Sequence, residues 1–259
     1  MLKSARVLSA AGLALAILGG ASASAATFVD FTKKPGSGAT NVRWIKNNTS
    51  GRLITGGASA TQPVAQAVIF NFQEPDLLVA LGLFGLQANF VLDGAAVNSP
   101  AMTTAEGWTQ AGVTGTFAFT LNQALTPTQI AASGCQNACT NLLSGSFTNG
   151  IIKGLGNAGS FTVADSGTQS VSFTSDFLQF PGGLENMTLT LGSVVGSPSI
   201  GHLPGKALNT FKASATGSFG SDPGPTGYVP EPATWGLMIM GFLGAGAMIR
   251  RRRASPAAA

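Results

Sequence analysis

Large apolar side chains and small hydroxyl side chains alternate along much of this 259-residue sequence. Val68, Phe70 and Phe72 occupy every second position of one stretch, and Phe117 and Phe119 belong to another. Because successive side chains of a strand point to opposite faces, this period predicts strands with one buried face. Turn-forming residues separate the stretches, which favours an antiparallel all-β arrangement.

We therefore predict an all-β fold, an antiparallel β-sandwich or jelly roll, over residues 27–220. Stretch 77–92 would hold one long strand or two successive strands, with a turn at Asp93-Gly94. Only 126–132 looks helical, because Pro127 suits a first helical turn and Thr126 can cap it. The expected strands lie at 27–34, 42–46, 52–55, 66–73, 77–92, 107–123, 142–148, 151–154, 160–164, 170–179, 187–195 and 207–220.

Six phenylalanines at these alternating positions form the expected core, since burial of such a side chain is favourable by about 1.5–3 kcal/mol. They are Phe70, Phe72, Phe117, Phe119, Phe161 and Phe173. Trp44 alternates with Val42, so we expect it to be half-buried rather than a sugar-binding platform.

The first 26 residues have the pattern of a secretory signal peptide. Lys3 and Arg6 precede an apolar run over 7–18, and small residues follow at 21–26. This order of basic, apolar and small residues is typical of a cleaved export signal. We expect cleavage after either Ala25 or Ala26, and the sequence does not distinguish between these two positions.

The other end of the chain combines three features. Pro230-Glu231-Pro232 is stiff and non-helical, because each proline fixes its own φ and restricts the preceding residue. Residues 235–249 carry no charge, and the four arginines Arg250, Arg251, Arg252 and Arg253 follow. Clustered arginines should stay on the cytoplasmic side of a membrane.

This combination resembles the PEP-CTERM sorting signal of Gram-negative bacteria in its PEPxxWA form. The resemblance rests on Pro230, Glu231, Pro232, Trp235 and the arginines, and Gly236 departs from the usual alanine. It implies recognition by an exosortase, a membrane-embedded cysteine transpeptidase-like enzyme, with cleavage near the proline motif. The same short domain is also called the ice-binding protein C-terminal domain, a name that we do not interpret as an activity.

We expect a transmembrane helix over the 17 residues 233–249. Such a helix covers about 25 Å, the lower limit for a bilayer core of about 30 Å. The predicted organisation is a signal peptide (1–26), a β-sandwich (27–220), a Pro/Gly-rich spacer (221–229), the sorting signal (230–253) and a cytoplasmic tail (254–259). The precursor would be anchored in the inner membrane transiently, with its body in the periplasm.

The basic pI of the whole chain misrepresents the exported part. Six of the 14 Lys and Arg residues lie in the two terminal segments, so eight basic and ten acidic residues stand between the apolar runs, a net charge of −2. Nucleic-acid binding requires basic residues that neutralise phosphates, and we therefore predict no nucleic-acid partner. Charged residues are only 9% of the chain, against about 25% in ordinary globular domains.

Cys135 and Cys139 are the only cysteines. Two cysteines this close in an oxidising compartment usually pair, so we predict an intramolecular disulfide. A metal site would need more ligands, and the chain has one histidine, His202. The spacing also differs from the Cys-x-x-Cys of redox pairs.

Three other patterns give no enzymatic prediction. His202 stands without a nucleophile elbow. Residues 154–159 match the dinucleotide fingerprint Gly-x-Gly-x-x-Gly, but a strand-like stretch follows where a helix is required, so we predict a hairpin turn. The carboxylates are scattered, and nothing in their spacing indicates the facing pair of a glycosidase.

We therefore predict an exported, non-enzymatic surface or extracellular-matrix protein with no catalytic residues, metal or cofactor. The resemblance implies an association with exopolysaccharide and biofilm production, and exopolysaccharide is a candidate partner. A carbohydrate- or surface-ligand-binding module is the alternative, which exposed aromatic residues would favour. A hydrolase is the third class, which a cleft with two close carboxylates would favour.

Overall fold

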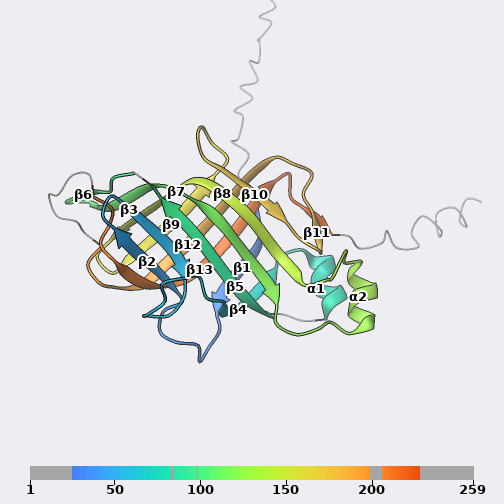
Figure 1. Ribbon diagram of the computed structural model, residues 1–259. Helices are drawn as coiled ribbons and strands as arrows, with labels where there is room; N and C mark the ends of the chain where they lie inside the picture. The colour runs from blue at the N-terminus through green and yellow to red at the C-terminus, as the bar shows by residue number, and fades with distance from the viewer. Residues whose placement is uncertain (1–24, 83–84, 98, 199–205, 228–259) are drawn as a thin grey trace, which may run out of the picture.

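Figure 1 presents the computed structural model of the protein, which describes residues 25–82, 85–97, 99–198 and 206–227. Most of these residues lie in antiparallel strands, so the all-β prediction is confirmed. The helices are α1 (Pro75–Leu81) and α2 (Pro127–Ser133). The strands are β1 (Ala26–Lys33), β2 (Val42–Asn47), β3 (Ser50–Thr55), β4 (Gln66–Phe72), β5 (Leu86–Ala96), β6 (Met102–Thr104), β7 (Gly107–Leu121), β8 (Asn141–Leu155), β9 (Ala158–Ala164), β10 (Ser170–Thr174), β11 (Leu178–Gln179), β12 (Leu184–Val195), β13 (Phe211–Asp222) and β14 (Thr226–Gly227).

Twelve strands form one continuous sheet that closes on itself. Its order is β1-β4-β5-β3-β2-β13-β12-β9-β8-β7-β6, with β10 on β8 and additional pairings of β1 with β13 and of β5 with β7. The ring therefore runs β5-β7-β8-β9-β12-β13. It closes through β1 and β4 along one part of β5 and β13, and through β2 and β3 along the other. A separate two-stranded sheet pairs β11 with β14.

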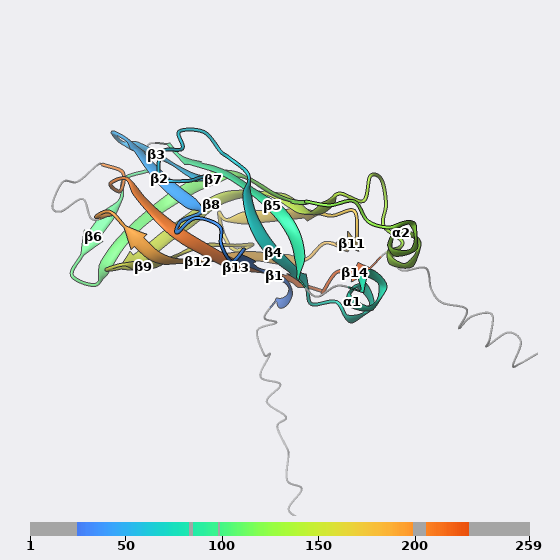
Figure 2. The same ribbon diagram turned by 90° about the horizontal axis from the view of Figure 1, so that it is seen from below.

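The expected sandwich of two sheets is thus replaced by a closed cylinder (Figure 1). Long strands explain the difference, because β7 and β8 have 15 residues each and change partners along their length. Closure also pairs edges that an open sheet would leave exposed. Figure 2 shows α1, α2, β11 and β14 together at one end of the cylinder and β6 at the other.

Phenylalanine rings fill the interior of the cylinder. All six predicted core phenylalanines are buried, with 0–6% of their surface exposed, so this prediction is confirmed. The ring of Phe119 lies 4.6 Å from that of Phe90, stacked, and 4.8 Å from that of Phe31, centroid to centroid. The interior is therefore packed, and the outward positions of the same strands carry mainly small polar residues.

Trp44 is fully buried, although we expected it to be half-buried. Its indole Nε1 donates a hydrogen bond to the carbonyl oxygen of Leu208 at 3.0 Å, which satisfies the polar end of the ring inside the protein. Gly51 on β3 makes room for the ring: a Cβ there would lie 1.9 Å from Trp44 Cζ2. The sequence alternation showed the direction of Trp44 but not this cross-strand space.

The helix expected near 126–132 is confirmed as α2. Thr126 accepts a hydrogen bond from the Gln129 backbone N–H, and the Gln129 side chain accepts one from the Thr126 N–H. This reciprocal pair is a capping box. The hairpin expected at 154–159 is also present, between β8 and β9.

Two local predictions were wrong. Part of the expected strand 77–92 is α1, which has Pro75 in its first turn and a left-handed Gly82 at its C-terminal cap. Asp93-Gly94, expected as a turn, lies within β5. Gly94 pairs there with Gly115 of β7, and a Cβ on Gly115 would lie 1.9 Å from the Asp93 carbonyl oxygen. These glycines thus allow two strands to approach closely.

Candidate functional site

The predicted sorting residues Pro230, Glu231, Pro232 and Trp235 lie outside the described residues, as do Arg250 to Arg253 and His202. The structure does describe the point from which the sorting segment continues. Gly227, the last residue of β14, is also the last described residue. The candidate site is therefore this attachment point and the residues that hold it.

The chain between β13 and β14 is folded onto the body rather than extended away from it. Pro225 is buried, and the Ser221 hydroxyl donates a hydrogen bond to the Pro223 carbonyl oxygen at 2.8 Å. Thr226 and Gly227 then pair with Gln179 and Leu178 of β11. This corrects the predicted spacer, because its residues as far as Gly227 belong to the folded part.

The partner strand β11 is anchored in the core. Leu178 is 1% exposed, and the preceding Phe177 is fully buried with its ring 5.8 Å from that of Phe72. After β11, the ring of Phe180 lies 5.3 Å from that of Phe28. The two strands of this small sheet are thus unequal, since β11 is held by aromatic packing and the pairing residue Thr226 of β14 is exposed.

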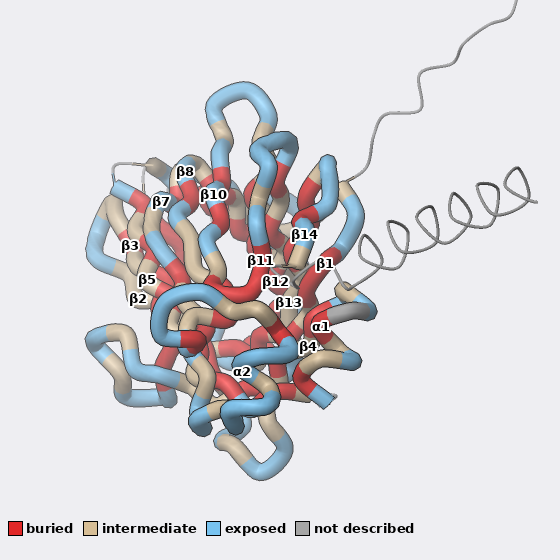
Figure 3. The backbone as a smooth tube through the Cα atoms, turned by 90° about the vertical axis from the view of Figure 1, so that its right-hand side faces the viewer, coloured by how far each residue is buried: buried red, intermediate tan, exposed pale blue. Residues whose placement is uncertain are grey.

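The start of the body lies beside its end. Ala26 pairs with Ser221, and Thr27 pairs with Gly220, so β1 begins next to the last residues of β13. Figure 3 shows β1, β14 and β11 near one another at the end of the molecule that also bears α1. The expected signal-peptidase sites after Ala25 or Ala26 would therefore adjoin the region from which the sorting segment continues.

Cys135 and Cys139 are joined in a disulfide that follows α2. Asp176, buried beside this loop, accepts hydrogen bonds at Oδ2 from the backbone N–H groups of Thr140 (2.9 Å) and Asn141 (3.0 Å). The Gln136 N–H donates to the Asp176 carbonyl oxygen at 2.7 Å. Asp176 thus organises the loop. The disulfide of the secreted protein stays a prediction, for which thiol titration of denatured, unreduced protein should find no free thiol.

Asp165 and Glu185 are a pair of neighbouring carboxyl groups. Asp165 accepts hydrogen bonds from the backbone N–H groups of Val171 (2.7 Å) and Glu185 (3.1 Å). Burial raises the pKa of Glu185 to about 7, and the negative charge of Asp165 adds to this rise. Glu185 is only 8% exposed. A substrate would have little access to this carboxyl, so the pair does not form the open cleft that a hydrolase needs.

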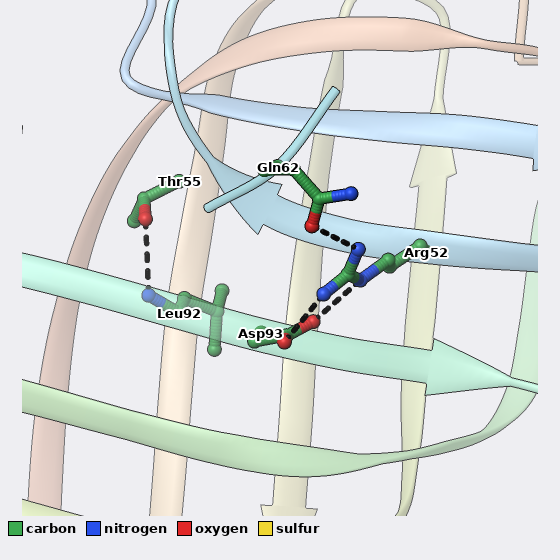
Figure 4. A network of polar contacts seen from close by, with 5 residues as sticks. All are labelled: Arg52, Thr55, Gln62, Leu92 and Asp93. Atoms are coloured by element: carbon green, nitrogen blue, oxygen red, sulfur yellow. Dashed lines mark hydrogen bonds and ion pairs between the residues drawn. The ribbon is translucent and has the colours of Figure 1, made fainter. Parts of the chain in front are cut away.

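Arg52 forms an ion pair with Asp93 on the outer face of the cylinder (Figure 4). Its Nε and Nη2 donate to the two Asp93 oxygens at 2.7 and 2.6 Å, and its Nη1 donates to Gln62 Oε1 at 2.9 Å. The arrangement ties β3 to β5 and to the loop after β3. We interpret it as a structural contact, because each of the three guanidinium nitrogens of Arg52 already donates a hydrogen bond to a protein oxygen.

Two features of the described residues bear on ligand binding. None of their exposed large apolar side chains is aromatic. In the same part of the chain, no three His, Cys, Asp or Glu side chains come together where they could hold a metal ion. We therefore assign no cofactor or metal ligands here.

Residues 229–253 match a family profile described as the PEP-CTERM protein-sorting motif. The chain carries a PEP-CTERM sorting motif. The motif starts two residues after the end of β14 and indicates export, a membrane-anchored precursor and processing by an exosortase, a membrane enzyme. Comparisons with curated proteins and with solved structures found no match.

Within the described ranges, neither helix is long and apolar enough to cross a membrane. The predicted transmembrane helix 233–249 lies beyond Gly227 and outside those ranges.

Proposed function

We propose that this protein is a non-enzymatic component of the cell surface or extracellular matrix, delivered there by an exosortase. The observation that carries the proposal is the PEP-CTERM motif at 229–253, which directly follows a closed and packed body. In the precursor, the signal peptide leads the body into the periplasm. The apolar run at 235–249 crosses the inner membrane, and Arg250 to Arg253 stop transfer in the cytoplasm.

The body supports a structural role more than a catalytic one. Its interior is filled by aromatic rings, and the carboxyl pair of Asp165 and Glu185 includes the buried Glu185. The outward Ser and Thr side chains supply many hydrogen-bond donors and acceptors without a strong net charge. Such a surface suits a hydrated, neutral matrix, and we propose exopolysaccharide as the material around the protein. The absence of exposed aromatic side chains among the described residues gives a dedicated carbohydrate-binding module no specific support.

The test follows the C-terminus of the protein in a bacterium that has an exosortase and in a matched strain that lacks it. Mass spectrometry of the mature surface protein should find a C-terminal peptide that ends near Pro230-Glu231-Pro232 only in the first strain. Glu231→Ala should leave membrane insertion intact and prevent this processing. Chains ending at Ala259 as the main surface form in both strains would replace the sorting proposal with a permanent anchor.

A further inference from the structure

The pairing of β14 with β11 limits how far the sorting motif can extend from the body. Glu231 is four residues after Gly227, and an extended chain spans at most about 3.3–3.6 Å per residue, so Glu231 lies within about 14 Å of β14. If β14 detached as far as Asp222, nine residues would separate Glu231 from the folded part. Its reach would then grow to about 30 Å.

This reach matters for an enzyme that must bind the chain around the motif. Extended peptides are commonly recognised through their main-chain N–H and C=O groups, several residues at a time. Thr226 and Gly227 already use one edge of their backbone for β11. The closed cylinder also follows at once on their N-terminal side, so a paired β14 brings the folded body close to the enzyme.

The β11–β14 ladder can also open without breaking any strand pairing of the cylinder. It has two residue pairs, Leu178 with Gly227 and Gln179 with Thr226, and belongs to a sheet separate from the closed one. Short, exposed ladders lie at the low end of local stability in proteins. The buried Pro225 and the Ser221–Pro223 hydrogen bond oppose opening, so the attached form is the resting one.

We propose that β14 is a release point that regulates sorting: the exosortase processes the form in which β14 has left β11. The inference rests on the proposed function and adds a determinant of the processing rate that lies in the body. When opening and closing are fast relative to cleavage, the rate follows the population of the open form. Pairing of β14 then keeps the motif close to the body until the enzyme captures a released chain.

The decisive variant closes the release point with a covalent bond. Gln179 and Thr226 are directly opposed in an antiparallel pair, where Cα atoms lie about 4.5–5.5 Å apart, a separation that suits a disulfide. Gln179→Cys with Thr226→Cys should therefore lock β14 in the oxidising periplasm. In enzyme-containing membranes, we expect processing of the locked precursor to be slower by about tenfold or more, and dithiothreitol to restore the wild-type rate.

A matched control locks a different ladder. Ser146 and Ser172 are opposed on β8 and β10 with their hydroxyl oxygens 2.9 Å apart. The double variant Ser146→Cys with Ser172→Cys adds the same number of thiols away from β14, and it should be processed at the wild-type rate with or without reductant. Wild-type protein with dithiothreitol controls for reduction of the Cys135–Cys139 bond.

A third variant separates access from misfolding. A flexible linker of about 12 Gly and Ser residues inserted after Gly227 of the locked variant supplies the missing reach, and processing should return without reductant. If the oxidised lock, verified by mass, is processed as fast as the wild type, or if the linker gives no recovery, the release point does not exist. If the wild type itself is never processed, the proposed function fails and this inference falls with it.

Discussion

The inner and outer faces of the closed sheet are built by the same strands from opposite chemistry. On β7, Phe117 and Phe119 are buried inside the cylinder, whereas Thr116 and Thr120 are exposed outside it. On the inner face, the ring of Phe119 contacts rings from four other strands, β1, β4, β5 and β13. On the outer face, the side chains form local hydrogen bonds, as between the hydroxyls of Ser144 and Thr174 at 2.9 Å. Stability should therefore be sensitive to changes of side-chain shape on the inner face and tolerant of substitutions on the outer face.

The largest effect should come from truncating a ring at the centre of the inner face. Phe119→Ala removes contacts with five other rings and should lower the free energy of unfolding by about 3–5 kcal/mol. Thr116→Ala on the same strand should change it by about 0.5 kcal/mol or less. Urea unfolding of the processed body measures both, and equal losses would contradict the contrast between the two faces.

A smaller effect should distinguish two buried tryptophans. Trp44 Nε1 donates to the Leu208 carbonyl oxygen, whereas the buried Trp108 Nε1 has no hydrogen-bond partner among the described residues. Trp44→Phe should therefore cost about 1–3 kcal/mol more than Trp108→Phe, because it leaves the Leu208 carbonyl without a buried donor. The same denaturant titration tests this, and a greater loss for Trp108→Phe would refute it.

The buried carboxyl of Glu185 breaks the apolar pattern of the inner face and should make stability depend on pH. Its pKa rises from an ordinary 4.5 to about 7, so between these values the folded state binds a proton that the unfolded state has lost. Stability should therefore fall as the pH rises from about 4.5 to about 7, and change little from this cause above that window.

Glu185→Gln should remove this part of the pH dependence and be more stable than the wild type at pH 8, relative to their difference at pH 4. Thermal unfolding across the range measures it. Glu106→Gln, on an exposed loop, is the matched control and should keep the wild-type slope. A wild-type slope in Glu185→Gln would contradict the assignment of this pH dependence to Glu185.

The smallest effect is expected on the outer face. Arg52 and Asp93 are about one-third exposed, at 34% and 38% of their side-chain surface. Removing an ion pair at such a position costs about 0–1 kcal/mol. Arg52→Ala should therefore destabilise the body slightly, and less in 1 M salt than in dilute buffer because salt screens the charges. A loss above about 2 kcal/mol would show that the contact with the Gln62 loop matters more than the charges.

The two faces also show how much of the fold could be predicted from the sequence. The buried phenylalanines followed from period two, and α2 followed from Thr126 and Pro127, because both signals are local. The closure of the sheet was not predictable in this way. Alternation is the same in a sandwich and a cylinder, and the pairing of Ala26 with Ser221 joins the two ends of the body.

One wrong prediction came from reading a short apolar run without the residues that flank it. The apolar run of Leu77, Leu78 and Leu81 fits a strand or a helix, and Pro75 and Gly82 select the helix α1. At the candidate site, the sorting motif itself was visible in the sequence. The burial of Pro225 and the β11–β14 pairing were not, because a Pro/Gly-rich stretch has the same composition whether it is free or attached.

The pairing of β1 with β13 has a consequence for the timing of export. In the export route proposed above, the chain would enter the periplasm N-terminus first, with β1 at the outset and β13 almost last. The pairing of β1 with β13 would then have to wait for about 190 residues to arrive. During that interval β1 has an unpaired edge open to other chains. In the precursor proposed above, the sorting segment would enter the membrane just after β13 and β14 have emerged. In that proposal, the arrest of translocation would coincide with the first moment at which the cylinder can close.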